Sequence, residues 1–160
     1  MIDRATFGPG GNSESFYDEG CKSTLEAPRW LSERGLDAYE FEAGNGLRTG
    51  RETLLKIGEQ AKKYNILMSL HTPYYISLSG VEEEKRLKSI EYIRQSIEAA
   101  ELLGADTIVV HAGSAAKISR AEAIDRTIEA LRDRFGKGII RNACLMGSPE
   151  LSQVDGMRVF

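Results

Sequence analysis

The chain has 160 residues, 41% of them hydrophobic and 28% charged, with a mean hydropathy of −0.32. These values are typical of a globular domain and exclude a disordered chain, and the absence of an apolar run approaching about 18 residues excludes a membrane-spanning helix. The net charge of −3 and the pI near 5.5 exclude a general attraction to nucleic acid, so such a partner would need a local basic loop.

The first residues and the cysteines indicate the compartment and the kind of metal site. The opening MIDRATFGPGG has no basic segment followed by an apolar stretch, so we expect a cytoplasmic protein. Cys21 and Cys144 are too few and too far apart for a disulfide framework or a cysteine-based zinc site. Any metal ion must therefore be held by histidine and carboxylate side chains.

One pattern recurs along the chain, in which a short apolar run is followed by a loop and then by a segment of helical periodicity. The predicted strands are residues 2–7, 37–42, 66–71, 107–111 and 138–144. Four capping-box pairs, in which Ser or Thr precedes Glu by three positions, predict where the helices begin. These pairs are Ser23 with Glu26, Thr49 with Glu52, Ser79 with Glu82 and Ser119 with Glu122.

Apolar side chains share one face of the third and fourth predicted helices. The third has Leu87, Ile90, Ile93, Ile97, Ala100 and Leu103 before Gly104, and the fourth has Ile124, Ile128, Leu131 and Phe135 before Gly136. Trp30 is a predicted core residue. Strands that alternate with helices form right-handed βαβ units, so we expect an α/β fold with a parallel sheet or barrel. A closed eight-stranded barrel usually needs roughly 250 residues, which this chain does not have.

Both histidines of the chain end predicted strands. His71 closes the run 66–71 and His111 closes the run 107–111. The carboxyl ends of parallel strands meet at one edge, and neighbouring strands lie about 4.8 Å apart, so both imidazoles could bind one metal ion or two adjacent ions. A lone histidine at a strand end is more often structural, but two on consecutive strands favour a functional site. Two histidines do not complete it, because catalytic zinc normally has three protein ligands.

The loops after these strands supply candidate substrate contacts. Tyr74, or Tyr75 beside it, could place an aromatic ring above the site, although a tyrosine that only covers the barrel end is the alternative. Gly113 and Ser114 are small residues that could contact a phosphate oxygen.

The second predicted strand and its loop supply charged candidates. Glu42 lies nearest the carboxyl end of the strand and is a candidate acid, base or metal ligand, whereas Glu40 on the same side lies farther from that end. Arg48 follows a glycine-rich stretch and is a candidate phosphate contact, with a solvated arginine as the alternative.

At HTPYYISL (residues 71–78) and HAGS (residues 111–114), the sequence resembles the endonuclease IV family of apurinic/apyrimidinic endonucleases, within the xylose-isomerase-like barrel superfamily. The resemblance covers roughly residues 2–140 and includes the opening FGPGGNS. It implies a (β/α)8 TIM barrel that binds up to three zinc ions. It also implies a hydrolase activity that cleaves DNA at abasic sites in base excision repair. It also implies that His71 and His111 bind zinc, that Tyr74 lies near the abasic nucleotide, and that Gly113 and Ser114 adjoin the metal ions.

The resemblance weakens toward the end of the chain. Where the family has a Pro-Glu-Thr-Met-Gly-like motif with a bridging glutamate, this chain has ACLMG at residues 143–147, and residues 148–160 lack helical periodicity. We therefore expect residues 1–147 to form the N-terminal half of a TIM barrel, about four βα units plus a fifth strand. Residues 148–160 would be the irregular tail of a truncated or frame-shifted chain. Unpaired sheet edges in such a half-barrel predict self-association, for example as a dimer.

Three functions stay open at this point. The first is a zinc-dependent phosphodiesterase acting on abasic DNA, as the resemblance implies. The second is a sugar isomerase or epimerase of the same superfamily, in which the histidines and Glu42 serve proton or hydride transfer with one divalent metal ion. The third is a fragment without catalytic activity. Salt separates the first two, because binding to a phosphate backbone weakens steeply with salt and binding to a neutral sugar does not.

Overall fold

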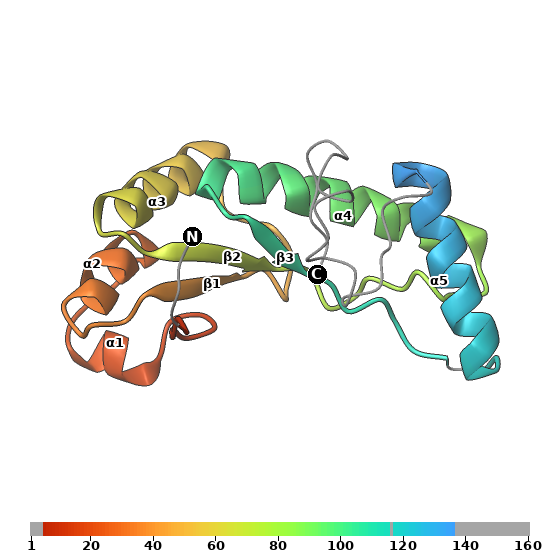
Figure 1. Cartoon of the computed structure of the whole chain (residues 1–160), viewed down its shortest axis with the longest axis horizontal. Coiled ribbons are helices and arrows are strands. Elements are labelled where there is room, and N and C mark those ends of the chain that lie inside the picture. The colour runs from red at the N-terminus through yellow and green to blue at the C-terminus, as the bar shows by residue number, and fades with distance from the viewer. Residues whose placement is uncertain (1–4, 116, 137–160) are drawn as a thin grey trace.

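The computed structural model describes residues 5–115 and 117–136. The first half of this part contains α1 (Glu14–Asp18), the 3-10 helix η1 (Thr24–Glu26), α2 (Ala27–Ser32), β1 (Ala38–Glu42) and α3 (Arg51–Lys63). The second half contains β2 (Leu67–His71), α4 (Glu83–Leu103), β3 (Thr107–Val109) and α5 (Arg120–Phe135). In Figure 1, α3 and α4 lie along one side of the sheet, and α5 lies at the end of α4 that is far from α3. Among the described residues, none of these helices has the length and apolar character needed to span a bilayer.

The three strands form a parallel sheet in the order β1-β2-β3. Each strand is followed by a helix, which confirms the predicted α/β fold built from βα units. Within the described residues the sheet is open, as expected for part of a barrel. The strands predicted at 37–42 and 66–71 are confirmed to within one residue, and the one predicted at 107–111 ends at Val109. The predicted strand 138–144 and the tail 148–160 lie outside the described residues.

The first predicted strand, residues 2–7, is wrong in its described part, because residues 5–7 form no strand. The chain instead runs parallel to β1 a few residues later, with an isolated bridge between Gly10 and Glu40. The Asp37 amide donates to the carbonyl of Phe7 at 2.9 Å, and the Glu40 amide donates to the carbonyl of Pro9 at 3.0 Å. Since proline has no amide hydrogen, Pro9 can accept from β1 but cannot donate, which limits regular pairing.

Side chains of the strands alternate between an apolar and a polar face of the sheet. The apolar face packs against the helices and forms the core. Buried side chains of this core include Phe41, Met68, Leu70, Leu54, Ile57, Ile93 and Leu103. The opposite face places Glu40, Ser69 and Thr107 side by side in register, and the Ser69 hydroxyl donates to Glu40 Oε2 at 3.2 Å. Because side chains alternate along a strand, Glu42 and His71 lie on this polar face. The candidate site therefore faces away from the core.

Two of the four predicted capping boxes begin helices. Ser23 and Glu26 form the complete box at η1. The Ser23 hydroxyl accepts from a backbone amide of the turn, and the Glu26 carboxylate accepts from the backbone amide of Ser23. At α5, the Ser119 hydroxyl accepts from the Glu122 amide at 3.2 Å, which confirms this residue as the N-cap.

The other two boxes are wrong. The N-cap of α3 is Gly50, one residue after Thr49, and that of α4 is Glu82; neither has a side-chain cap. The hydroxyl of Ser79 instead donates to the carbonyl of Ser114 at 2.9 Å. A contact between two distant loops therefore takes this hydroxyl away from the helix that follows it.

The apolar faces of the last two helices are only partly covered. The predicted end of α4 is confirmed by Gly104, whose φ of 67° is left-handed, and Ile90, Ile93 and Leu103 are buried. Leu87, however, is 63% exposed, and Ile124 on α5 is 49% exposed, so these two positions of the apolar faces are not buried. Among the described residues, no further βα unit lies beyond β3 to cover these positions. The prediction that Trp30 lies in the core is confirmed.

Candidate functional site

Four side chains gather at the carboxyl edge of the sheet, on its polar face. Glu42 ends β1 and His71 ends β2, and the two residues are partners in the strand register. Tyr74 follows His71 in the next loop, and His111 follows β3. Parallel pairing brings these residues together, since it places the ends of all three strands at one edge.

The two imidazoles lie side by side. Nε2 of His71 is 3.1 Å from Nε2 of His111, and the ring centroids are 4.9 Å apart. His71 is buried, whereas His111 is exposed. The pair therefore has one ring held within the protein and one ring open to solvent.

A backbone carbonyl sets the protonation of the buried ring. Nδ1 of His71 lies 3.1 Å from the carbonyl oxygen of Thr72, which can only accept, so Nδ1 carries a hydrogen. In neutral His71 the lone pair is then on Nε2, the nitrogen that faces His111. Metal-binding histidines are commonly held in this way through their second nitrogen. For both Nε2 atoms to serve as ligands, His111 must carry its own hydrogen on Nδ1.

The spacing of the pair fits a shared divalent ion. Two zinc–nitrogen bonds of about 2.0–2.1 Å in tetrahedral geometry place the nitrogens roughly 3.3 Å apart. The observed separation of 3.1 Å is close to this value. Within residues 5–115 and 117–136, however, no group of three or more His, Cys, Asp or Glu side chains could hold a metal ion. The described part of the chain thus brings two imidazole nitrogens to a spacing that two ligands of one ion could have, and it contains no complete metal site.

Tyr74 lies over both histidines. Its ring centroid is 4.9 Å from that of His71 and 5.9 Å from that of His111, and 59% of the residue is exposed. Its hydroxyl donates to Glu42 Oε2 at 3.4 Å. The negative charge of Glu42, followed by desolvation and this hydrogen bond, raises the pKa of Tyr74. The hydroxyl therefore stays protonated, and the open ring face could stack on a planar or sugar ring.

Glu42 lies beside His71 on the side opposite to His111. Its Oε2 atom is 4.0 Å from Nδ1 of His71, whose hydrogen already points to the Thr72 carbonyl. The carboxylate is therefore next to the imidazole but away from the nitrogen that faces the second ring. In this position it can hold the Tyr74 hydroxyl.

Gly10 and Gly11, which were not among the predicted site residues, border the Glu42 side chain. A Cβ on Gly10 would lie 3.2 Å from Glu42 Oε1, and one on Gly11 would lie 3.0 Å from Cγ; Gly11 also has a φ of 74°. The Asn12 side chain fixes this segment, since it accepts from the Tyr39 hydroxyl at 2.8 Å. The two adjacent glycines are the sequence feature that could have indicated this contact. Their position beside Glu42 follows from the bridge between Gly10 and Glu40 of β1.

Gly113 and Ser114 hold two loops together. Gly113 has a φ of 108°, and a Cβ there would lie 2.8 Å from the hydroxyl oxygen of Ser79 and 3.1 Å from Cα of Ser77. The Ser114 carbonyl accepts from Ser79. The small size of Gly113 is therefore explained by packing between the loops after β2 and β3.

Arg48 lies in the loop between β1 and α3 and is exposed. It makes no hydrogen bond or ion pair with the four clustered side chains, which all belong to the described residues. The structure therefore does not bring its guanidinium into the cluster.

Residues 28–134 match the sequence model of the family described as xylose isomerase-like TIM barrel. The probable endonuclease 4 of Sulfurihydrogenibium sp. (strain YO3AOP1) is 32% identical over 77 residues, which are 48% of this chain and 28% of that protein. Among solved structures, endonuclease IV from Thermus thermophilus has a TM-score of 0.52 at 23% identity, over 76% of this chain and 45% of the other. The 3-keto-D-glucoside 4-epimerase from E. coli has a TM-score of 0.61 at 17% identity, over 82% and 51%. The chain thus spans 28% to 51% of the lengths of these proteins, and the two structures share its barrel fold.

Proposed function

The chain belongs to the xylose isomerase-like TIM barrel family, and from this premise we propose that it carries the first two metal ligands of a phosphodiesterase acting on abasic sites in DNA. The observation that carries this proposal is the histidine pair, whose Nε2 atoms lie 3.1 Å apart at the carboxyl edge of the sheet. The sequence relative named probable endonuclease 4 supports the choice of this activity within the family.

In this proposal, His71 and His111 hold a zinc ion through their Nε2 atoms. A bound zinc ion would lower the pKa of a water molecule and neutralise charge on a phosphodiester oxygen. The Thr72 carbonyl orients His71 for this role by holding Nδ1. The exposed His111 can exchange its Nε2 hydrogen with solvent, which lets it become a ligand.

The other clustered residues serve the substrate. Tyr74 offers its exposed ring to the nucleotide that lacks a base, and Glu42 holds the hydroxyl of Tyr74. Arg48 is proposed to reach a DNA phosphate, because it is exposed and bound to none of the clustered side chains. Gly113 and the exposed Ser114 are proposed to border the same phosphate, on the loop that carries His111.

A sugar epimerase or isomerase is the second candidate. Two observations favour it: the net charge of −3 gives no attraction to DNA, and Glu42 places a carboxylate inside the site. A carboxylate repels a phosphodiester but can accept a proton from a sugar carbon. In this alternative, Glu42 and the histidines move protons on a neutral substrate held by one divalent ion.

Zinc binding by the full chain tests the pair. We expect His71→Ala and His111→Ala each to weaken zinc binding by at least about tenfold, measured by titration calorimetry. Glu40→Gln is the matched control, since Glu40 lies on the same face of β1 but bonds to Ser69. Equal zinc affinity in all four proteins would contradict the metal site.

Substrate binding separates the candidate functions. We expect the zinc-loaded chain to bind and incise an abasic duplex, with an affinity that falls steeply as salt rises. Binding of a free monosaccharide that is insensitive to salt would favour the epimerase. Zinc binding without turnover of either substrate would indicate a fragment without catalysis.

We also propose that the chain is cytoplasmic and that it self-associates through the edge of β3, which pairs only with β2 among the described residues. Size-exclusion chromatography with light scattering is the test. A well-behaved monomer would contradict self-association.

A further inference from the structure

The ring of Tyr74 rests on a glycine of another loop. A Cβ built on Gly44 would lie 2.2 Å from Cε2, 2.7 Å from Cδ2 and 2.9 Å from Cζ of Tyr74. Distances this short do not occur for real Cβ atoms, so any side chain at position 44 would overlap the ring. The two residues also share a hydrogen bond, in which the Tyr74 amide donates to the Gly44 carbonyl at 3.0 Å.

The backbone at Gly44 does not itself require glycine. Gly44 is absent from the residues with left-handed φ, which include its neighbour Gly46 at 103°. An alanine could therefore adopt the backbone conformation of Gly44, whereas at Gly46 it would be strained. The contact with Tyr74 is what excludes a side chain from position 44.

The backbone that carries Tyr74 has little freedom to move away. Pro73 directly before it is fully buried, and the Thr72 amide donates to the Val109 carbonyl at 2.9 Å. On the other side, the Leu78 amide donates to the Ala112 carbonyl at 2.9 Å. An overlap at Gly44 would therefore be relieved by rotation of the tyrosine side chain, which has solvent on its exposed side.

We propose that Gly44 is a positioning residue, and that the absence of a side chain there keeps the ring of Tyr74 over the His71–His111 pair. A side chain at 44 would turn the ring toward solvent and remove its contact with both imidazoles and with Glu42. The inference deepens the proposed function and rests on it for the role of the pair. Its geometry, however, requires neither metal nor DNA.

Imidazole proton NMR of the metal-free full chain tests the proposal. The chain has only two histidines, so two sets of ring signals report on the site. Tyr74→Ala should remove the ring-current shift of both, and Gly44→Ala should cause the same change. In the Tyr74→Ala background, Gly44→Ala should cause no further change. Gly50→Ala is the matched control, because Gly50 has an ordinary φ of −67° and a Cβ there meets nothing within 4 Å.

Histidine signals unchanged by Gly44→Ala, or changed equally with and without Tyr74, would overturn the proposal. If Gly44→Ala unfolds the chain, the double variant decides: recovered folding on removal of Tyr74 supports the steric contact, and an equally unfolded double variant overturns it. Because no zinc or DNA is present, these outcomes are distinct from a failure of the proposed function, which would appear in the zinc titration.

Discussion

The region around β1 and β2 is packed far more completely than the region around β3 and α5. β1 and β2 pair over five residues, whereas β2 and β3 pair over three. α3 buries Leu54, Ile57 and Ala61, and α5 buries only Ala123 among the described residues. Both regions have the same strand-loop-helix pattern, but among the described helices α3 packs against α2 and α4, whereas α5 packs mainly against α4. The pattern forms a core only where helices on both sides cover it.

The largest expected effect on stability comes from replacing an isoleucine by alanine in each of the two regions. We expect Ile57→Ala on α3, where the side chain is 1% exposed, to lower the free energy of unfolding by about 2–5 kcal/mol. Ile124→Ala on α5, where the residue is 49% exposed, should change it by less than about 0.5 kcal/mol. Urea unfolding measures both. Equal losses would show that the face of α5 is covered in solution and would break the comparison.

The histidine pair has one member in each region, and the two alanine variants should differ in stability in the same direction. His71→Ala should cost about 1–3 kcal/mol, because the buried ring is lost and the Thr72 carbonyl loses its donor. His111→Ala should change the free energy of unfolding by less than about 0.5 kcal/mol, because that residue is exposed. The measurement is urea unfolding of the zinc-free chain. A larger loss for His111→Ala would mean that β3 is packed more tightly than β2.

A helix cap provides a smaller contrast. Ser119→Ala should cost about 1 kcal/mol, because the serine hydroxyl is the N-cap of α5. Thr49→Ala, at a position with the same sequence pattern ahead of α3, should cost less than about 0.5 kcal/mol, because Gly50 is the N-cap there. Thermal unfolding followed by circular dichroism compares the two. The reverse order would contradict the observed start of either helix.

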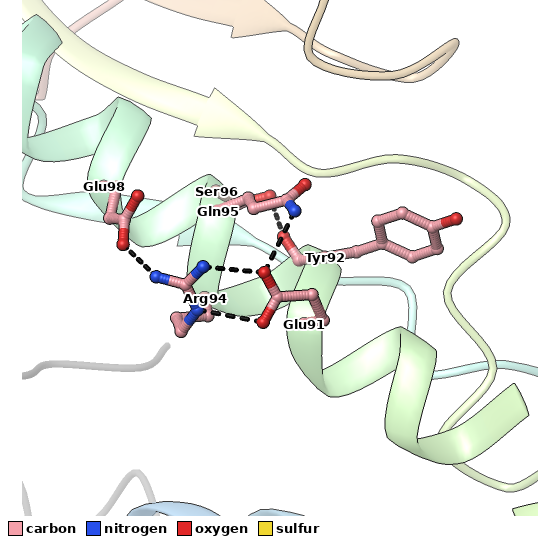
Figure 2. A network of polar contacts seen from close by, with 6 residues as sticks. All are labelled: Glu91, Tyr92, Arg94, Gln95, Ser96 and Glu98. Atoms are coloured by element: carbon pink, nitrogen blue, oxygen red, sulfur yellow. Dashed lines mark hydrogen bonds and ion pairs between the residues drawn. The ribbon is translucent and has the colours of Figure 1, made fainter. Parts of the chain in front are cut away.

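The smallest effect is a pH dependence on α4. Figure 2 shows Arg94 between Glu91 and Glu98, and the hydrogen bond from Arg94, followed by that from Gln95, lowers the pKa of Glu91 to about 2. The charge of Arg134 on α5 contributes to this shift. A lowered folded-state pKa stabilises the fold above the ordinary value near 4.5, and this contribution is lost as the pH falls toward 2.

We therefore expect Arg94→Gln to reduce stability slightly at pH 7 and to have less effect at each step below pH 4.5. Carboxyl NMR titration should show the Glu91 pKa rising strongly in Arg94→Gln and slightly in Arg134→Gln. A Glu91 pKa that does not change in Arg134→Gln would show that α5 does not act on α4 through this charge. The difference in packing between the β1–β2 region and the β3–α5 region would then be larger. Because these side chains are exposed, salt should weaken the effect.

The sequence was sufficient to predict β1, β2, α4, α5 and the meeting of the two histidines. Alternation and helical periodicity are local signals, and they placed β1 and β2 to within one residue. His71 and His111 meet because parallel strands end at one edge, which follows from topology alone. Topology did not show that the Nδ1 hydrogen of His71 points to a backbone carbonyl, because that depends on the path of the next loop.

The contacts between loops could not be predicted from the sequence. Thr49 and Ser79 have the same pattern as true caps, but Ser79 bonds to Ser114, 35 positions away. The contact of Gly44 with Tyr74 also joins separate loops, and a lone glycine does not indicate what it touches. Leu87 lies on the apolar face that the helical periodicity predicts, but it is exposed. Periodicity shows which side chains share a face and does not show what packs against that face.

The acceptor that orients His71 belongs to the main chain of Thr72, and this has a consequence for how the site tolerates mutation. Every amino acid brings the same carbonyl, so replacement of the side chain at 72 leaves the proton on Nδ1 and the lone pair on Nε2. Only a change that rotates the peptide plane between Thr72 and Pro73 would reverse the tautomer. The tautomer of the buried imidazole therefore depends on the course of the backbone and not on which side chain stands at position 72.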